Sequence, residues 1–582
     1  MNAKTPQFDQ AIERYFAGLE LDEQGGQWRT CRVSGEKFYI RPEDVEFYRK
    51  IRVPLPTLSP LERWRKKLTF APGYQFFKVK SAHTGKEIIS VYPRTAPFKI
   101  YEHGIWFSDQ WDPLSYGKAP DSGQPFFGQF RLLQREVPRP NLNNDSSNVN
   151  SEYTNSSTHL KNCYVAFDML YGEDLYYVEC CMKNKNCMDC WACISADSCY
   201  GSHGTTMFKC FFCYWTENSI ESYFLFDCKN CEHCFMCSNL RNKKYCFYNQ
   251  QLSREEYEKK LREVNLGNYE ELQKYLKDFQ ELKKNAIKKN IHGEQWVNSV
   301  GTWMFNVKDC YFVLFAFESE RVCYSLGFLG ARDSYDILGG ANFELCYEFI
   351  SVSAENNYGI KFSNNVHNSR DLEYCDSCYN CHDLFGCVGL RNKSFCIFNK
   401  QYAPEEYWRV VDLLKKAMLE RGEYGEFFPP ALAPFPYNTS LITAYPGFED
   451  LEKAKRDGYW VENIPEDASG ETSLSVLRSS ELSLDIKDVD DSILQKVILD
   501  VEHNRKFRIV PFELAFYRKY NLPLPRVHPF VRMAQWRKDM DMRLQFWEVA
   551  CAKCGKIVPT MYDPALGEKN IYCEQCYHAK VA

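Results

Sequence analysis

The most regular feature of the chain is a series of aromatic positions that recurs about every twelve residues through its middle. A Cys, Ser or Asn usually stands just before the aromatic residue. Neighbouring residues in a strand point to opposite faces, so the pattern predicts one column of small side chains and one of aromatic side chains. The first series is Tyr164, Tyr176, Met188, Tyr200, Phe212, Phe224, Met236 and Tyr248, and the second is Tyr311, Tyr324, Tyr335, Tyr347 and Tyr358.

A fixed short period of this kind predicts a β-solenoid, in which each rung buries one face against the next. The spacing leaves two coil lengths open. A coil of about 12 residues would have a thin interior that favours Cys inside and Tyr outside. A coil of about 23 residues could hold the aromatic side chains inside.

The two Cys-rich stretches are copies of one another. Leu240-Arg241-Asn242-Lys243 reappears 150 residues later as Leu390-Arg391-Asn392-Lys393, and Cys228, Cys231 and Cys237 match Cys378, Cys381 and Cys387. Each copy is followed by a charged segment that is predicted to be helical. We therefore expect two solenoid segments, each followed by a helical insertion.

A second repeat links the two ends of the chain. Phe47-Tyr48-Arg49-Lys50 reappears 469 residues later as Phe516-Tyr517-Arg518-Lys519, and Pro54-Leu55-Pro56 reappears as Pro523-Leu524-Pro525 at the same offset. A shared offset makes chance a poor explanation, so one module is expected to begin and end the protein.

These patterns predict a mainly β chain, with a repetitive β-solenoid (β-helix-like) centre flanked by two related zinc-ribbon-like modules. The 582 residues correspond to about three to five domains. The expected segments are an N-terminal helical segment (1–28), a degenerate ribbon-like module (29–115), solenoid segment 1 (150–252), a helical insertion (253–295), solenoid segment 2 (300–402), a helical and loop connector (403–499) and the C-terminal module with its zinc ribbon (500–582).

The interpretation of the 27 cysteines depends on the cell compartment in which the protein resides. The N-terminus shows no signal-peptide core and no run approaches the length of a membrane helix, so the cytoplasm is the expected location. Thiols stay reduced there, which argues against a disulfide framework. Metal ligands, small core residues or a catalytic thiol remain as interpretations.

One cysteine group carries a specific chemical signal. Cys551-x2-Cys554 is followed after 18 residues by Cys573-x2-Cys576, the spacing of a zinc ribbon, and Gly555 fits the tight turn after the second Cys. We predict a structural zinc (Zn) site at Cys551, Cys554, Cys573 and Cys576. Four protein ligands leave no open position, so this zinc should not be catalytic.

The repeat between the ends shows which positions have lost these ligands. Ser81, Thr84, Glu102 and Ile105 match the four zinc-site cysteines, so the N-terminal copy should hold its fold by packing, through Trp106 and Phe107. Further upstream, Cys31 and Ser34 match Asp500 and His503, and Ser59 matches His528. Asp500, His503 and His528 could form an open three-ligand metal site, or could be exposed remnants of a former ribbon.

Other cysteine runs have a weaker signal. Cys228-x2-Cys231-x2-Cys234-x2-Cys237 resembles a cluster-binding run, but a bacterial ferredoxin has three residues before its last Cys and a Pro after it. Two shorter runs, Cys187-Cys190-Cys193 and Cys375-Cys378-Cys381, share the spacing. Metal binding and burial of small residues in repeat columns both stay open.

Charge is distributed unevenly along the chain. Residues 29–115 hold 16 Lys+Arg against 9 Asp+Glu, and 505–582 hold 14 against 7, although the whole chain is acidic with a net charge of −5. Arg63-Trp64-Arg65-Lys66-Lys67 and the region from Arg532 to Lys538 interleave basic and aromatic residues. They could grip phosphates and stack on bases of a nucleic acid, or form a solvated amphipathic helix.

The N-terminal pattern around Cys31, Gly35 and Pro54-Leu55-Pro56, together with Trp111-Asp112-Pro113-Leu114, the Cys-aromatic rungs and the Leu-Arg-Asn-Lys boxes, resembles one group of proteins. These are the large, uncharacterised, Cys-rich, zinc-ribbon-containing proteins of ultrasmall candidate-phyla bacteria, and the resemblance covers nearly the whole chain. Some carry the label CaiB/BaiF-type CoA transferase, which no motif here supports. The family pattern has CxxC pairs where this chain has Cys31/Ser34 and Ser59/Glu62, so the resemblance implies only the last zinc site.

No P-loop, GxGxxG after a strand, GxSxG or HExxH occurs, and no residue is predicted to be catalytic. The sequence therefore favours a zinc-binding scaffold or binding protein without catalytic activity, with a protein or nucleic acid as partner through its basic ends and no membrane partner. The alternative is an enzyme, or a redox or metal-handling protein that uses the Cys-rich solenoid face.

Overall fold

The computed structural model describes the chain except for residues 1–3, 145–146, 152, 168, 180–187, 189, 192, 195–197, 352–353, 465–473, 540–542 and 582. It contains two compact units, each assembled from two separate stretches. One unit comprises residues 1–143 and 291–462, and the other comprises 144–290 and 463–582. Each unit therefore combines one end of the chain with one Cys-rich stretch, and we call them the N-unit and the C-unit.

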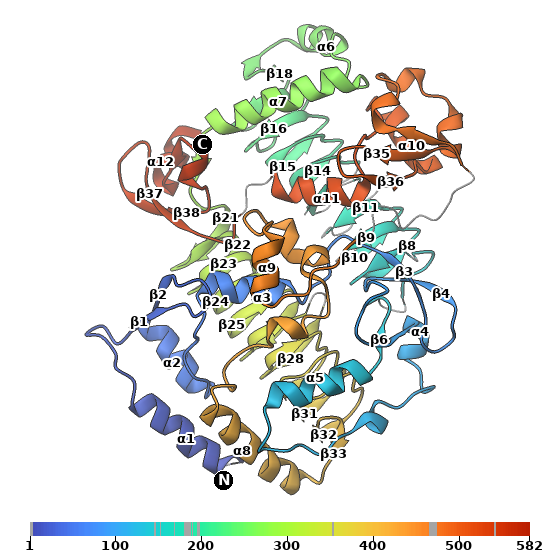
Figure 1. Cartoon of the computed structure of the whole chain (residues 1–582). Coiled ribbons are helices and arrows are strands. Elements are labelled where there is room, and N and C mark those ends of the chain that lie inside the picture. Colours follow the sequence, from blue (N-terminus) through green and yellow to red (C-terminus); the bar gives the residue numbers. More distant parts are fainter. Residues whose placement is uncertain are drawn as a thin grey trace. The chain divides into compact units, whose positions relative to one another are not determined.

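The N-unit is organised around a thirteen-stranded sheet whose strands are almost all parallel (Figure 1). Its strands are β21 (Gly293–Val297), β22 (Val300–Lys308), β23 (Tyr311–Phe317), β24 (Glu320–Leu329), β25 (Arg332–Leu338), β26 (Ala341–Glu344), β27 (Tyr347–Ile350), β28 (Glu355–Tyr358), β29 (Lys361–Asn364), β30 (Arg370–Glu373), β31 (His382–Phe385), β32 (Ser394–Ile397) and β33 (Lys400–Gln401).

Helices and short hairpins of the N-unit come from its two ends. They are α1 (Pro6–Ala17), β1 (Gln27–Thr30), β2 (Lys37–Ile40), α2 (Pro42–Lys50), α3 (Pro60–Leu68), β3 (Phe77–Lys80), β4 (Glu87–Ser90), β5 (Ile100–Tyr101), α4 (His103–Trp106), α5 (Phe126–Glu136), β6 (Arg139–Pro140), α8 (Pro404–Glu420) and α9 (Leu451–Arg456).

The C-unit repeats this plan with the other Cys-rich stretch. Its stacked strands are β7 (Thr154–Asn155), β8 (Thr158–Lys161), β9 (Tyr164–Phe167), β10 (Leu170–Glu173), β11 (Tyr176–Glu179), β12 (Cys190–Trp191), β13 (Cys193–Ile194), β14 (His203–Phe208), β15 (Tyr214–Ile220), β16 (Tyr223–Phe226), β17 (Phe235–Ser238), β18 (Cys246–Phe247) and β19 (Gln250–Gln251).

The remaining elements of the C-unit are α6 (Arg254–Arg262), α7 (Tyr269–Asn285), β20 (Lys288–Lys289), β34 (Val476–Arg478), β35 (Val497–Asp500), β36 (Arg505–Phe507), α10 (Pro511–Lys519), α11 (Pro529–Lys538), β37 (Trp547–Ala550), β38 (Ile557–Thr560), β39 (Ile571–Tyr572) and α12 (Glu574–Val581). Helix α6 begins where Ser253 and Glu256 form a capping box, in the charged segment that the sequence predicts to be helical.

The strands confirm the prediction of a mainly β chain only in part, because the structure is mixed, with 31% strand and 28% helix. The periodicity of the strands is clear. Tyr164 pairs with Tyr176, and Phe235 pairs with both Tyr223 and Phe247, so these strands lie in parallel beside the strand twelve residues earlier. Side chains at equivalent positions are thereby aligned.

A period of three, which the sequence analysis did not identify, divides each twelve-residue repeat. From Thr206 to Tyr248, almost every third residue has a left-handed backbone with φ between 45° and 58°. L-residues adopt this conformation at a steric cost, and Asn tolerates it best. The residue that follows each turn faces the core, as Cys228, Cys231, Cys234 and Cys237 do after Asp227, Asn230, His233 and Met236.

The core of each stack is therefore narrow and filled mainly by Cys, Val, Leu and Ala. Cysteine suits it because the thiol is small and donates to the backbone. Cys228 Sγ donates to Phe226 O at 3.5 Å and to Cys237 O at 3.7 Å, and a serine at the same kind of position, Ser219, accepts from Cys231 N at 3.2 Å. Buried carbonyl and amide groups thus find partners within the stack.

Many of the aromatic columns lie outside this core and are covered by helices. Tyr335 stacks on Phe47 of α2 with ring centroids 3.8 Å apart in the N-unit. Tyr176 stacks on Phe512 of α10 at 3.5 Å in the C-unit. The end modules and the stacks are therefore joined through aromatic contacts, which accounts for the high aromatic content of the chain.

Candidate functional site

The strongest candidate site is the group of four cysteines at the C-terminus, Cys551, Cys554, Cys573 and Cys576. Their sulfur atoms all lie within 4.8 Å of one another. Cys551 and Cys554 stand in the turn between β37 and β38, and Cys573 and Cys576 stand at the start of α12. The structure confirms that the sequence brings these four residues together as a possible metal site. The identity of the metal stays a prediction.

The turn between β37 and β38 favours the thiolate of Cys551. Cys551 N donates to Lys556 O at 2.8 Å and Gly555 N donates to Cys551 O at 2.9 Å, which needs the left-handed φ of 76° at Gly555. Burial would raise the pKa of Cys551, but amide donors from Cys573, Cys554 and Lys553 outweigh it and lower the pKa to about 6. A thiolate is the form that binds a metal, so the donor set fits zinc.

The module that carries the four cysteines is anchored to the stack of its own unit. Tyr577 of α12 donates to both carboxylate oxygens of Asp227 at 2.7 and 2.6 Å, and Arg241 Nη2 lies 3.0 Å from Asp227 Oδ1. Strand β39 also pairs with β20, through Lys288 opposite Ile571. A metal that orders the start of α12 would therefore also hold this junction.

The N-terminal copy of the module keeps the turn without the cysteines. Ser81 N donates to Lys86 O at 2.9 Å and Gly85 N donates to Ser81 O at 2.9 Å, as their counterparts do in the turn at Cys551. The hydroxyls of Ser81 and Thr84 donate to the two carboxylate oxygens of Glu102. Hydrogen bonds therefore stand where the other copy has its cysteines, so the expectation that packing alone holds this module is wrong. Trp106 is fully buried, as expected, but Phe107 is exposed.

An earlier turn in each end module has the same form. Ser34 N donates to Cys31 Sγ at 3.5 Å, and His503 N donates to Asp500 Oδ1 at 3.2 Å. Asp500, His503 and His528, which the sequence left open as a three-ligand site, are not a group whose ligand atoms converge among the described residues, and the ring of His503 instead hydrogen-bonds to Asp500 at 3.0 Å. Among the described residues, the four C-terminal cysteines are the group whose ligand atoms converge.

The cysteine runs inside the stacks do not converge on a metal position in the part of the chain that the structure describes. Cys375, Cys378 and Cys381 are buried and donate to backbone carbonyls, as the run from Cys228 to Cys237 does. Burial raises the pKa of Cys237 and of Cys346 to about 12. These thiols are structural in character. Cys187 and its run lie outside the residues whose side chains are described.

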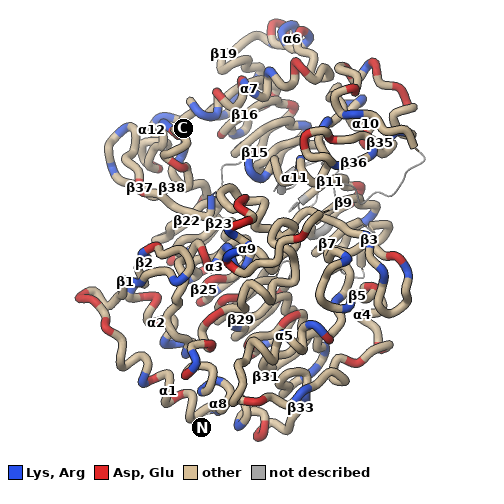
Figure 2. Tube along the Cα trace, in the orientation of Figure 1, with Lys and Arg blue, Asp and Glu red and all other residues tan. Residues whose placement is uncertain are grey.

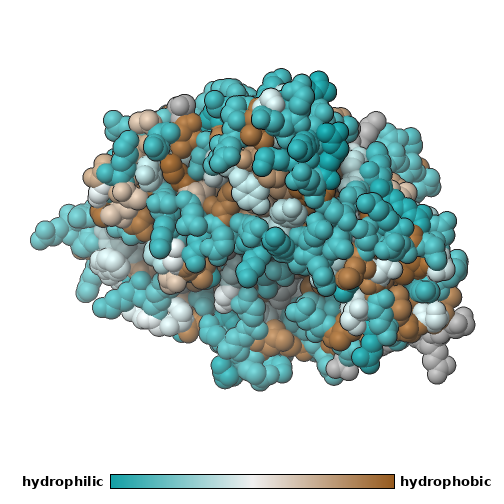
Figure 3. All heavy atoms as spheres, turned by 90° about the horizontal axis from the view of Figure 1, so that it is seen from above, coloured by the Kyte–Doolittle hydropathy of each residue, from teal (hydrophilic) through white to brown (hydrophobic). Residues whose placement is uncertain are grey.

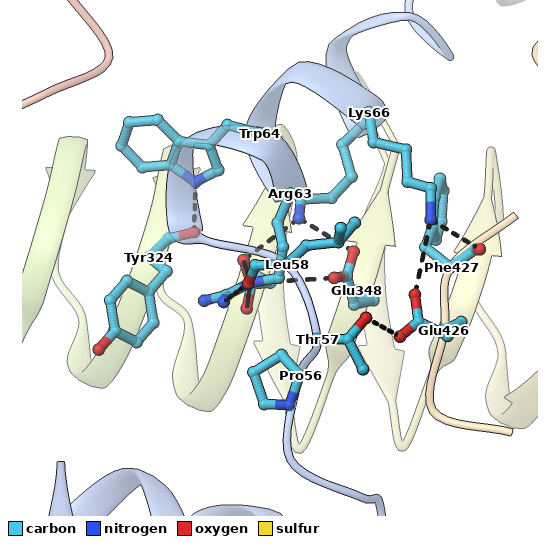
Figure 4. Close-up of polar contacts among 12 residues, drawn as sticks. Pro56, Thr57, Leu58, Arg63, Trp64, Lys66, Tyr324, Glu348, Glu426 and Phe427 are labelled. Carbon is cyan, nitrogen blue, oxygen red and sulfur yellow. Dashed lines mark hydrogen bonds and ion pairs between the residues drawn. The ribbon is translucent and has the colours of Figure 1, made fainter. Parts of the chain in front are cut away.

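The basic segments have a location that the sequence did not reveal. Helix α3 lies against strands of the N-unit sheet (Figure 4). It is buried from Glu62 to Leu68, so both an exposed phosphate-binding surface and a solvated helix are wrong for it. Lys67, with no exposed surface, pairs with Asp336 at 3.2 Å and with Glu348 at 3.0 Å. Trp64 Nε1 donates to Tyr324 O at 2.6 Å.

The related helix α11 of the C-unit is also largely covered. Arg532 and Arg537 are each 7% exposed, and Trp536 lies against Tyr200 with ring centroids 6.0 Å apart. Figure 2 shows acidic positions interleaved with basic ones at both ends of the chain. Some basic residues of the end modules are thus paired inside their own unit, as Lys67 is with Asp336 and Arg532 with Glu513. Asp336 pairs with Lys67 but lies far from it along the chain, so no local sequence pattern could indicate this pair.

Comparisons with protein-family models, with curated proteins and with solved structures found no match. The described helices include none that is long and apolar enough to cross a membrane. A function for this protein is therefore inferred from its fold and its candidate site alone.

Proposed function

We propose that this protein is a zinc-stabilised binding scaffold without catalytic activity, with a protein as its partner. The observation that carries the proposal is the convergence of Cys551, Cys554, Cys573 and Cys576 at a junction anchored by Tyr577 to the stack. Four thiolates close the coordination of zinc, which supports a structural role for the metal.

We further infer that both stacks are β-solenoids with a coil of twelve residues, each coil having four sides of three residues. The pairing of residues twelve apart and the left-handed backbone at every third residue support this inference. The C-terminal module would then be a zinc ribbon docked on the side of a solenoid. Cytoplasmic location and the resemblance to the Cys-rich proteins of ultrasmall bacteria fit the free thiols, most of which are buried.

A protein partner is favoured over nucleic acid because the basic-aromatic helices are committed to internal contacts. The face drawn in Figure 3 is mainly hydrophilic, with hydrophobic residues in scattered groups. A surface of this kind suits a polar, transient interface better than an obligate one.

The redox or metal-handling alternative has one observation in its favour. The four thiols from Cys228 to Cys237 follow one another around a single turn of the stack, and hydrogen bonds from Cys228 and Cys234 lower the pKa of Cys231. Their near-complete burial opposes reaction with any solute.

Maleimide labelling followed by peptide mass spectrometry separates the two functions. The scaffold predicts that Cys554 and Cys576 label once zinc is chelated, while Cys228 and Cys231 label only on unfolding. Rapid labelling of Cys231 in the folded, zinc-loaded protein would favour the redox function instead.

A further inference from the structure

A cavity of about 320 Å³ lies within the N-unit, apart from the four C-terminal cysteines and from the stack core. A volume of this size suits a small molecule, since ligand sites span about 300–1,000 Å³. Apolar side chains supply part of the wall, among them Leu58, Phe127, Phe427 and Pro430. The charged groups of the wall decide which kind of molecule fits.

Four carboxylates line the cavity, and each has at least one cation beside it among the described residues. In Glu423, Oε2 accepts from Arg421 Nε at 2.8 Å and Oε1 accepts from Phe126 N at 3.0 Å. Both oxygens of this carboxylate are therefore occupied, and its charge is balanced by one guanidinium. The other three carboxylates are Glu62, Glu426 and Asp457.

Glu62 and Asp457 share two cations. Arg65 Nη1 lies 3.4 Å from Glu62 Oε2 and 2.5 Å from Asp457 Oδ2, and Lys453 Nζ lies 3.9 Å from Glu62 Oε1. Two cations thus face two carboxylates, so this side of the cavity has no surplus charge of either sign.

Glu426 differs because two cations surround this one carboxylate. Arg32 Nη2 lies 3.0 Å and Lys66 Nζ lies 3.8 Å from Glu426 Oε2, while Thr57 donates to Glu426 Oε1 at 2.5 Å. Arg32 and Lys66 both line the cavity themselves. The cavity therefore carries one positive charge more than its carboxylates balance, and this surplus lies at Arg32 and Lys66.

Lys66 shows that the surplus charge is poorly compensated (Figure 4). Its side chain is buried, and among the described residues its Nζ donates one hydrogen bond, to Phe427 O at 3.2 Å. An ammonium group has three donors, and a buried donor without a partner is costly. Burial lowers the pKa of Lys66 and outweighs the opposing carboxylates of Glu426 and Glu348. An anionic group in the cavity would supply both the missing acceptor and the missing charge.

We propose that this cavity binds a small monocarboxylic acid with an apolar body. The ligand's carboxylate would lie at Lys66 and Arg32, and its hydrocarbon part would lie against Phe127 and Phe427. A single negative charge matches the surplus, whereas a cationic ligand would add to it and a neutral one would leave Lys66 without an anion. The inference is independent of the predicted zinc and of the scaffold function.

NMR titration of the full-length protein with matched ligands tests the proposal. The probe is 3-phenylpropanoate, compared with 3-phenylpropan-1-ol, which keeps the apolar body without the charge, and with acetate, which keeps the charge without the apolar body. The acid should bind about tenfold or more tightly than either comparison ligand, because only the acid supplies a charged hydrogen bond together with an apolar contact. No binding of the acid, or equal binding of the acid and either comparison ligand, would overturn the proposal.

Two variants place the carboxylate. Lys66→Met should weaken binding of 3-phenylpropanoate by about tenfold or more and leave binding of 3-phenylpropan-1-ol unchanged. Arg32→Gln changes a side chain that is 57% exposed, so the fold should survive, and it should weaken binding of the acid more than that of the alcohol. This second variant keeps the test decisive if Lys66→Met does not fold.

Lys415→Met is the matched control for loss of a buried lysine. Lys415 belongs to the same unit and is 6% exposed, close to the 5% of Lys66, but it does not line the cavity. The control should retain binding of 3-phenylpropanoate. Unchanged binding of the acid in Arg32→Gln and Lys66→Met would place the ligand elsewhere and overturn the assignment.

Discussion

At the scale of single residues, buried charge is the least expected feature of the protein. Lys67 has no exposed surface and lies between Asp336 and Glu348, with Arg63 also 3.0 Å from Asp336. Two cations and two carboxylates balance one another away from water, which is tolerable only when each charge keeps its partners.

Replacing Lys67 by Met should therefore lower the free energy of unfolding by about 3–5 kcal/mol, because two buried carboxylates lose a partner. Urea denaturation measures the change. Lys50→Met is the matched control, since Lys50 is 55% exposed in its pair with Asp333 and should cost less than about 1 kcal/mol. Equal losses in the two variants would show that the charge cluster is not buried as described.

Glu373 gives a pH dependence with a definite sign. Burial would raise its pKa, but Lys415, Lys361 and the Tyr424 hydroxyl lower it to about 2 from an ordinary 4.5. A carboxyl whose pKa is lowered by folding contributes stability above the unfolded value and loses it as pH falls from about 4.5 to 2. The loss should reach about 3 kcal/mol.

The check is the difference in unfolding free energy between pH 6 and pH 3 for the wild type and for Glu373→Gln/Lys415→Met. The double variant removes the buried pair together and should show a smaller acid loss. If the free energy of unfolding fell equally in both proteins between pH 6 and pH 3, Glu373 would not be the source of the fall.

At the scale of elements, the left-handed turns explain where Asn is used. Asn342, Asn356, Asn368, Asn380 and Asn392 recur along one exposed column of the N-unit, all with positive φ. Asn342 Nδ2 donates to Asn356 Oδ1 at 3.1 Å, so these side chains also bridge successive repeats. Asn is suited to both roles, since it tolerates the left-handed region and carries both a donor and an acceptor.

A pair of substitutions at Asn380 tests this assignment. Asn380→Val should destabilise the N-unit by about 1–3 kcal/mol, because a β-branched residue is strained at a φ of 54°. Asn380→Gly, which removes the side chain but suits the backbone, should cost less. Thermal unfolding compares the two, and a more harmful glycine would mean that the backbone there is not left-handed.

The turn retained at Ser81 predicts that a metal site can be built there by substitution. Because its hydrogen bonds match those at Cys551, the variant Ser81→Cys/Thr84→Cys/Glu102→Cys/Ile105→Cys should gain one zinc per chain relative to the wild type. The same variant with Ile105 left unchanged is the control and should bind the added zinc more weakly. No gain of zinc would mean that the two modules differ in backbone.

The features of the structure that the sequence predicted are those that depend on residues close together along the chain. The twelve-residue series and the zinc spacing were predictable, because each depends on residue types at fixed intervals. The left-handed residue just before each Cys of the Cys-x2-Cys runs was missed, because these runs have the residue spacing of a metal motif and differ from it in backbone conformation. The burial of α3 was missed because Asp336 lies 269 residues from Lys67.

At the scale of the molecule, the chain is two units of one plan, each joining an end module to the Cys-rich stretch from the other half of the sequence. The predicted zinc lies in the C-unit alone. Chelation should therefore increase hydrogen exchange in 547–582 and at β20, and leave α3 and β25 of the N-unit unchanged. Equal deprotection of both units would contradict a local role for the metal.

The most direct test of the account is the metal content of the purified protein by elemental analysis, for the wild type and for Cys573→Ser/Cys576→Ser. We expect about one zinc per wild-type chain, no iron, and loss of the zinc in the variant. Iron, several zinc ions per chain, or zinc that persists in the variant would show that the cysteines of the stacks bind metal and would contradict the structural role assigned to them.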